Sequence, residues 1–149
     1  MRWAAPLVLV FVFFVPAAAL ALPTSKVVID TKHGPVTFEV QIAGDEASQE
    51  RGLMYVKHLA PNAGMLFDFH TEVMTSFWMK NTYIPLDMLF IQQSGIVSSI
   101  AANARPMDQT TIPSLVPVRA VLEIDGGRAK QLGIQPGDVV HNAIFGNAK

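Results

Sequence analysis

The sequence contains no cysteine. Disulfide bonds, thiolate metal ligands and cysteine nucleophiles are therefore excluded, and so is the attachment of a lipid through a cysteine. Without covalent cross-links, the folded state depends on the packing of its core.

The sequence also has no excess of positive charge. Its 11 Lys+Arg and 12 Asp+Glu give a formal net charge of −1, and the basic residues form no run. Proteins that bind nucleic acid rely on clustered cations that contact phosphates. Nucleic acid is therefore not an expected partner.

Three familiar enzyme motifs are missing as well. The sequence has no His-Glu-x-x-His run for zinc and no Gly-x-Ser-x-Gly nucleophile turn. Gly126-Gly127 lacks the spacing and the Lys-Ser or Lys-Thr pair of a phosphate-binding loop. Residues far apart in the sequence can still assemble a catalytic site, so enzymatic activity stays open. No cofactor is predicted.

The chain begins with an apolar segment. Residues 3–22 contain no charged residue, Pro16 interrupts the apolar run, and residues 17–21 read Ala-Ala-Ala-Leu-Ala. Small residues at this spacing are typical of a signal-peptidase site, so we predict a cleavable signal peptide over residues 1–21 and a periplasmic or secreted protein. The alternative is a retained membrane anchor, because about 20 apolar residues can span a bilayer. After cleavage we expect no stable membrane insertion.

The remaining segment, residues 22–149, has the length of one domain. A β-hairpin is predicted around His33-Gly34-Pro35, because the run from Val36 to Ile42 alternates apolar and polar residues. Further strands are predicted over residues 65–69, 76–79, 86–91, 96–100 and 118–124, and from residue 139 toward residue 145.

Helices are scarce. Asp45 can cap a short helix over residues 46–51, and a second short helix over residues 128–132 ends at Gly133. Residues 104–117, with three prolines, are predicted to form an extended surface loop. Two short helices cannot cover both faces of an open sheet. We therefore predict a mainly β (α+β) fold, in the form of a compact single-domain curled sheet or β-barrel-like structure.

Four sequence blocks follow one another at close spacing. They are Arg51-Gly52-Leu53-Met54, Gly64-Met65-Leu66-Phe67, residues 77–82 (Phe-Trp-Met-Lys-Asn-Thr) and Ile84-Pro85-Leu86-Asp87, and further blocks lie at residues 121–123, 126–127 and 132–139. In this order the blocks resemble the domain of unknown function 192 family over nearly all of residues 22–149. One departure is Val56, where the family often has a basic residue, and Lys57 comes one position later.

The resemblance implies a compact, mostly β, barrel-like domain that is often exported and occurs in bacteria and archaea. It implies no reaction and assigns no catalytic residue. Any role of the motif residues must therefore follow from their own chemistry.

The segment from Trp78 to Asp87 concentrates polar chemistry around one predicted turn. It offers an indole, an ammonium, an amide, a hydroxyl and a carboxylate, which together could bind a small polar ligand. The structural alternative places Trp78 in the core and lets Asn81-Thr82 satisfy its own turn. Arg51 would then fasten its helix rather than clamp an anion. The candidate ligand-binding residues are Arg51, Trp78, Lys80, Asn81, Thr82, Asp87 and Arg105.

Asp87 stands in an otherwise apolar predicted strand. A carboxylate there is either paired, which lowers its pKa, or unpaired, which raises its pKa and makes a general acid. Because an isolated buried charge costs several kcal/mol, pairing is preferred. By the same reasoning Glu123 and Asp138 are given structural roles. The cations available to Asp87 are Arg51, Lys80, Arg105 and Arg119.

Methionine and histidine side chains in an exported protein could serve as ligands for copper(I). The sequence has no Met-x-Met pair, and methionine commonly fills irregular gaps in cores, so core packing is preferred and no metal ligand is predicted. The residues concerned are Met54, Met65, Met74, Met79, Met88, Met107, His33, His58, His70 and His141.

Three functional hypotheses follow. The first is a non-enzymatic binding domain for a small polar ligand or a protein partner, with its site at the turn of residues 78–87 beneath the loop of residues 104–117. The second is a hydrolase-like enzyme that uses Asp87 with Arg51 or Lys80. The third is a periplasmic copper-binding protein that uses methionine and histidine.

Overall fold

A β-hairpin opens the fold in a computed structural model that describes residues 21–149. Strands β1 (Thr24–Thr31) and β2 (Gly34–Ala43) pair antiparallel, with Thr31 opposite Gly34. In β2 the Phe38 and Val40 side chains are buried, whereas Glu39 and Gln41 are exposed. The alternation that predicted this hairpin therefore reflects one buried and one exposed face.

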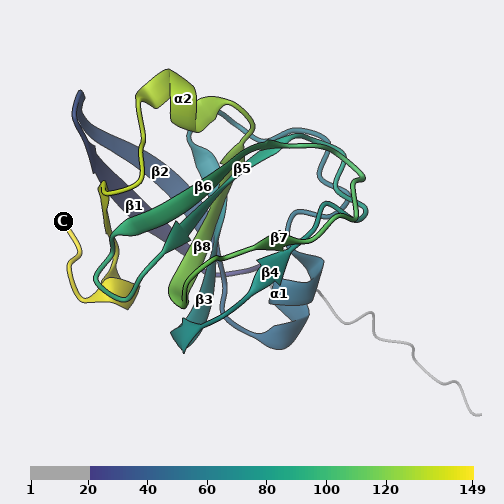
Figure 1. Cartoon of the computed structure of the whole chain (residues 1–149), viewed down its shortest axis with the longest axis horizontal. Helices are drawn as coiled ribbons and strands as arrows, with labels where there is room; N and C mark the ends of the chain where they lie inside the picture. The colour runs from purple at the N-terminus through teal and green to yellow at the C-terminus, as the bar shows by residue number, and fades with distance from the viewer. Residues whose placement is uncertain (1–20) are drawn as a thin grey trace, which may run out of the picture.

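Seven strands form one sheet in the order β6-β5-β8-β3-β2-β1-β9 (Figure 1). Strands β2 and β3 pair in parallel, and the other neighbours pair antiparallel. The remaining strands of this sheet are β3 (Ala63–Val73), β5 (Leu86–Ile91), β6 (Val97–Ala104), β8 (Val118–Asp125) and β9 (Val139–His141).

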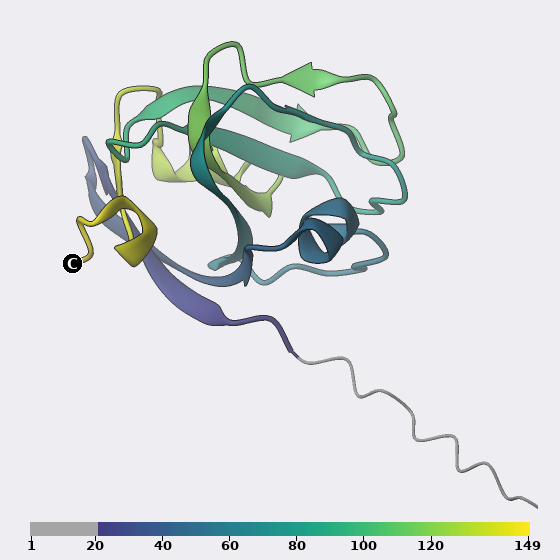
Figure 2. The same ribbon diagram turned by 90° about the horizontal axis from the view of Figure 1, so that it is seen from below.

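The sheet is strongly curled, as the view from below shows (Figure 2). An antiparallel bridge joins Ile96, just before β6, to Val139 in β9. Here the Val97 N–H donates to the Asp138 carbonyl at 3.0 Å, and the Val140 N–H donates to the Gly95 carbonyl at 2.8 Å. The molecule is a single mainly β domain with a half-barrel sheet and two short helices, so the predicted fold class is confirmed.

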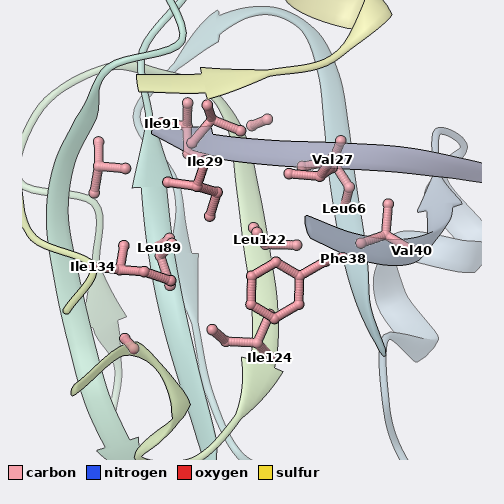
Figure 3. Packing of buried hydrophobic residues seen from close by; sticks show 14 residues of the cluster. Val27, Ile29, Phe38, Val40, Leu66, Leu89, Ile91, Leu122, Ile124 and Ile134 are labelled. Atoms are coloured by element: carbon pink, nitrogen blue, oxygen red, sulfur yellow. The ribbon is translucent and has the colours of Figure 1, made fainter. Parts of the chain in front are cut away.

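Successive residues of the central strands face opposite sides of the sheet and build two apolar clusters. The first cluster lies inside the curl, where Phe38 meets Leu122 and Ile124 (Figure 3). Helix α2 (Arg128–Leu132) adds Ala129 to this cluster. It follows that the half-barrel is filled by side chains rather than by solvent.

The second cluster lies on the opposite face and positions the candidate site. It includes Phe67 and Phe90, and it is covered by helix α1 (Glu46–Arg51) and by a two-stranded ribbon of β4 (Ser76–Phe77) and β7 (Ile112–Pro113). The Phe77 ring packs edge-on against Phe67, at a centroid distance of 5.0 Å, and against Phe90, at 6.2 Å. These contacts hold the ribbon on the sheet.

Several boundaries differ from the sequence predictions. The predicted loop of residues 104–117 contains β7, and the predicted strand of residues 76–79 ends at Phe77. The last strand stops at His141 because the Asn142 side chain accepts the Ile144 N–H at 3.1 Å and starts the 3-10 helix η1 (Ala143–Phe145). Both predicted α-helices are confirmed with their bounds.

The predicted signal peptide of residues 1–21 lies outside the described residues, except for Ala21. Within residues 21–149 no helix has both the length and the apolar character needed to cross a membrane.

Candidate functional site

A cleft of about 700 Å³ opens on the second-cluster face, between α1 and the β4–β7 ribbon. In Figure 2 the helix α1 lies below the green strand β7. One wall is formed by α1 and its following turn, through Gln49, Glu50, Arg51, Gly52, Leu53 and Met54. The rest is formed by Phe67 and Phe69 of β3, by Thr75, Ser76, Phe77, Trp78, Lys80 and Thr82 around β4, and by Thr111 and Glu123.

Glu123 of β8 is the most deeply buried of the charged residue types that line this cleft, and we call the part of the cleft beside it the closed end. Its side chain is only 4% exposed and points to the same face as Val121. In the sheet register Glu123 stands opposite Met65 on one neighbouring strand and Met88 on the other. The carboxyl group is therefore flanked by apolar side chains within the sheet.

The Glu123 carboxyl has no hydrogen-bond or ion-pair partner among residues 21–149, and burial raises its pKa to about 8. In the same part of the chain, every completely buried side-chain nitrogen or oxygen does have a hydrogen-bond partner. The Glu123 oxygens consequently reach the surface of the cleft. At neutral pH the group is mostly a carboxylic acid, which can both donate and accept a hydrogen bond.

Local contacts of α1 place Arg51 on the cleft wall. The Asp45 carboxylate accepts the Ser48 N–H at 2.8 Å and starts the helix. The Gln49 amide donates to the Asp68 carbonyl at 2.8 Å and ties the helix to β3. Gly52 then ends the helix with a φ of 48°, and a Cβ there would lie 3.2 Å from the Phe67 ring. Arg51 is exposed at this end, and its guanidinium forms no ion pair within the described chain.

The opposite wall combines an aromatic surface with a cation. Trp78 is 48% exposed, and the Lys80 ammonium lies 5.1 Å from its ring centroid. The Thr82 hydroxyl donates to the Lys80 carbonyl at 3.1 Å. The loop of residues 104–117 is tied to this wall, because the Met79 N–H donates to the Asp108 carbonyl at 2.8 Å. This contact explains why Thr111 lines the same cleft.

Four of the predicted candidate residues line the cleft, namely Arg51, Trp78, Lys80 and Thr82. Two others lie elsewhere. The Asn81 amide donates to the Tyr55 hydroxyl at 3.0 Å, and Arg105 forms an exposed ion pair with Asp108 at 3.0 Å. The structural alternative for Trp78 is wrong, because nearly half of its surface is exposed rather than packed in the core.

Asp87 has a structural environment. It is completely buried, and its carboxylate accepts backbone N–H groups from Asn103 at 2.8 Å, Gly127 at 2.9 Å and Ala129 at 2.8 Å. The prediction that Asp87 pairs with a cation is wrong, because three backbone N–H groups bind its carboxylate instead. Arg119 instead pairs with Asp68 in a buried ion pair. Asp87 thus joins β5 to the end of β6 and to α2, away from the residues that line the cleft.

The six methionines of residues 22–149 differ in burial, and Met54 is half-buried. Met65, Met79 and Met88 are buried in the second cluster, in line with the preferred explanation of core packing, whereas Met74 and Met107 are exposed. Across residues 21–149 no three His, Asp or Glu side chains lie close enough together to hold a metal ion.

Glu123 was not among the predicted site residues. The sequence shows that Glu123 lies in an apolar segment, but Asp87 lies in an apolar segment as well, so this feature does not distinguish the two acids. The distinguishing fact is the register, which places Met65 and Met88 beside Glu123. The sequence carried only part of this information: Glu123 is two residues from Val121 and therefore faces the same side of a strand that is buried almost throughout.

A family model described as DUF192, uncharacterized ACR, matches residues 27–142, which confirms the resemblance seen in the motif blocks. A crystal structure of a protein from Sinorhizobium meliloti, described as a candidate transcription regulator, is 41% identical with a TM-score of 0.83, over 85% of this chain and 99% of that chain. A protein of unknown function from Novosphingobium aromaticivorans is 40% identical with a TM-score of 0.80, over 93% and 94% of the two chains. No curated protein matches the chain.

Proposed function

Because the chain belongs to the DUF192 family, whose description names no activity, we propose a function from the chemistry of its cleft: the protein binds a small organic ligand above Glu123 without converting it. The observation that carries this proposal is the unpartnered carboxyl group at the closed end of the cleft.

A bound ligand would supply the hydrogen-bond partner that the described chain does not give Glu123. Because the side chain is only 4% exposed and its oxygens reach the cleft, a ligand there can hydrogen-bond to it in place of water, with a net gain of about 0.5–1.5 kcal/mol. The cleft volume of about 700 Å³ lies within the range of roughly 300–1,000 Å³ that is typical of small-molecule sites. A small ligand is favoured over a protein partner, because the Glu123 side chain is only 4% exposed and a flat protein surface would not reach it.

Hydrolysis that uses Asp87 is not favoured. The carboxylate that the hydrolase hypothesis requires, Asp87, already accepts three backbone N–H groups and is not exposed to the cleft. Nucleic acid is not proposed as the ligand, since acidic residues outnumber basic ones. The description of the Sinorhizobium meliloti protein is therefore not carried over to this chain.

The ligand is proposed to be met outside the cytoplasm. The apolar segment and the Ala-x-Ala pattern of residues 17–21 support export with cleavage after Ala21. Intact-mass measurement of the exported protein is expected to give a chain that begins at Leu22. A mass that retains residues 1–21 would contradict cleavage and would favour a membrane-tethered form.

The binding proposal is tested with a cleft-filling substitution and a matched control. Ser76 lines the cleft and is exposed, so Ser76→Trp is expected to fill it, whereas Ser94→Trp adds the same side chain at an exposed turn elsewhere. A library of small molecules is titrated onto the isotope-labelled protein, and the amide signals of residues around Arg51 and Trp78 are followed. We expect ligands that shift these signals in the wild type and the control but not in Ser76→Trp. If no compound shifts them in the wild type, the proposal is wrong.

A further inference from the structure

On the basis of the proposed function, we infer that the ligand is an organic acid with an apolar, preferably aromatic, body. Its anionic group binds Arg51 and Lys80 near the opening of the cleft, and a hydroxyl or carbonyl at its other end hydrogen-bonds to the Glu123 carboxyl. Three separate features of the cleft support this arrangement.

The walls match an apolar body. Phe67, Phe69, Phe77 and Trp78 all line the cleft, and Leu53 adds an aliphatic surface. The Phe67 and Phe77 rings meet edge to face with an interplanar angle of 87°, and the Trp78 ring beside them is 48% exposed, so its face is accessible to an aromatic ligand. A planar apolar group is therefore the body that this surface fits best.

The charges near the opening match an anion. Three charged side chains other than Glu123 line the cleft, namely Glu50, Arg51 and Lys80. The groups beside Glu123 on the neighbouring strands are Met65 and Met88, which carry no charge. With Glu123 protonated, the cleft has an excess of one positive charge. Arg51 forms no ion pair within residues 21–149, so its planar guanidinium is available for a carboxylate.

The closed end matches a neutral hydrogen-bonding group. Because burial raises the pKa of Glu123 to about 8, the carboxyl is about nine-tenths protonated at pH 7. A hydroxyl or carbonyl on the ligand can pair with this acid without bringing a second charge into the apolar end. A cationic ligand would be repelled by Arg51 and Lys80, and an ion pair with Glu123 would require the buried acid to ionise. An organic cation is therefore disfavoured.

The test uses three probes built on one skeleton. They are 3-(4-hydroxyphenyl)propanoate, the same acid without its hydroxyl, and tyramine, which carries an ammonium in place of the carboxylate. Calorimetric or NMR titration of the exported protein is expected to show binding of the hydroxy acid, roughly tenfold weaker binding without the hydroxyl, and the weakest binding of tyramine. Arg51→Gln and Lys80→Gln are each expected to weaken the hydroxy acid by about fivefold or more.

Variants of Glu123 distinguish a neutral acid from a carboxylate. Glu123→Gln keeps a neutral group that both donates and accepts, so binding is expected to stay within about threefold, whereas Glu123→Leu is expected to lose about tenfold. The wild-type affinity should fall as the pH rises through about 8, and the affinity of Glu123→Gln should not. The probe itself does not titrate in this range, since its carboxyl and phenol have pKa values of about 4 and 10.

The outcomes separate the two proposals. If tyramine binds more tightly than the hydroxy acid, or if Glu123→Gln abolishes binding, the ligand class inferred here is wrong while binding in the cleft stands. If none of the probes binds and no library compound shifts the cleft signals, the proposed function itself is wrong. Folding of each variant is checked by its unfolding curve, so that a loss of binding is not a loss of structure.

Discussion

Replacing Glu123 with glutamine is expected to make the protein more stable, and increasingly so at higher pH. Burial raises the pKa of Glu123 from its ordinary value of 4.5 to about 8. Between these pH values the folded chain holds a proton that the unfolded chain has released. The folded state then binds more protons than the unfolded state, so the free energy of unfolding falls as the pH rises. Glu123→Gln removes this dependence, because an amide does not titrate.

The magnitude follows from the shift of the pKa. Each pH unit inside the interval lowers the free energy of unfolding by about 1.4 kcal/mol. Through this one group the wild-type chain loses about 1 kcal/mol by pH 5 and roughly 4 kcal/mol by pH 8, relative to strongly acidic solution. The stability advantage of Glu123→Gln over the wild type is expected to grow by roughly 3 kcal/mol across this range. If the Glu123 carboxylate had a hydrogen-bond or ion-pair partner in the folded state, the stability advantage of Glu123→Gln would not grow with pH.

Urea unfolding measured at several pH values, without added ligand, checks the prediction in a single domain of this size. Glu39→Gln is a matched control, because Glu39 is an exposed residue of β2, and it is expected to change the stability by less than about 0.5 kcal/mol. If the pH profiles of Glu123→Gln and the wild type run parallel, Glu123 is not a buried neutral acid. The cleft would then lack the neutral acid to which the proposed ligand hydrogen-bonds.

Three further substitutions test how the site is held in place, each by urea unfolding. Asp87→Ala leaves three backbone N–H groups without their acceptor and is expected to cost about 3 kcal/mol or more; wild-type stability would contradict the structural role. Arg119→Met leaves the buried Asp68 carboxylate without its arginine, so that only His70 contacts remain, and is expected to cost about 3 kcal/mol, most of which the added change Asp68→Leu should restore. Gly64→Ala would place a Cβ 2.5 Å from the Glu123 carbonyl and is expected to cost about 1–3 kcal/mol; an unchanged midpoint would show that β3 can move away from β8.

The secondary structure was predictable where local pattern decides it. Alternation in residues 36–42 predicted β2, and the Asp45 cap predicted α1 with its bounds. Strand β7 was not predictable, because its two residues form a strand only by pairing with Ser76 and Phe77, more than thirty residues earlier. Pro113 inside it argued against a strand, yet on a two-stranded ribbon a proline needs no second partner.

The candidate site was predictable only in part, for a similar reason. Arg51, Trp78 and Lys80 are residue types that suit a binding surface, and the structure does bring them to one cleft. These residues come together because α1 and the β4–β7 ribbon cover the same face of the sheet. No local sequence pattern predicts that arrangement. The side chains of Asn81 and Arg105 are equally suited to binding a polar ligand, but neither residue lines the cleft.

By itself, the sequence determined the family, the mainly β fold, the two helices and the absence of thiol chemistry. It could not decide between its two acids in buried strands. Asp87 and Glu123 are each 4% exposed or less, yet Asp87 meets backbone N–H groups from residues 16 to 42 positions away and Glu123 meets methionines. Only the tertiary structure brings those partners together, and a carboxyl group takes its charge state and its role from the partners that surround it.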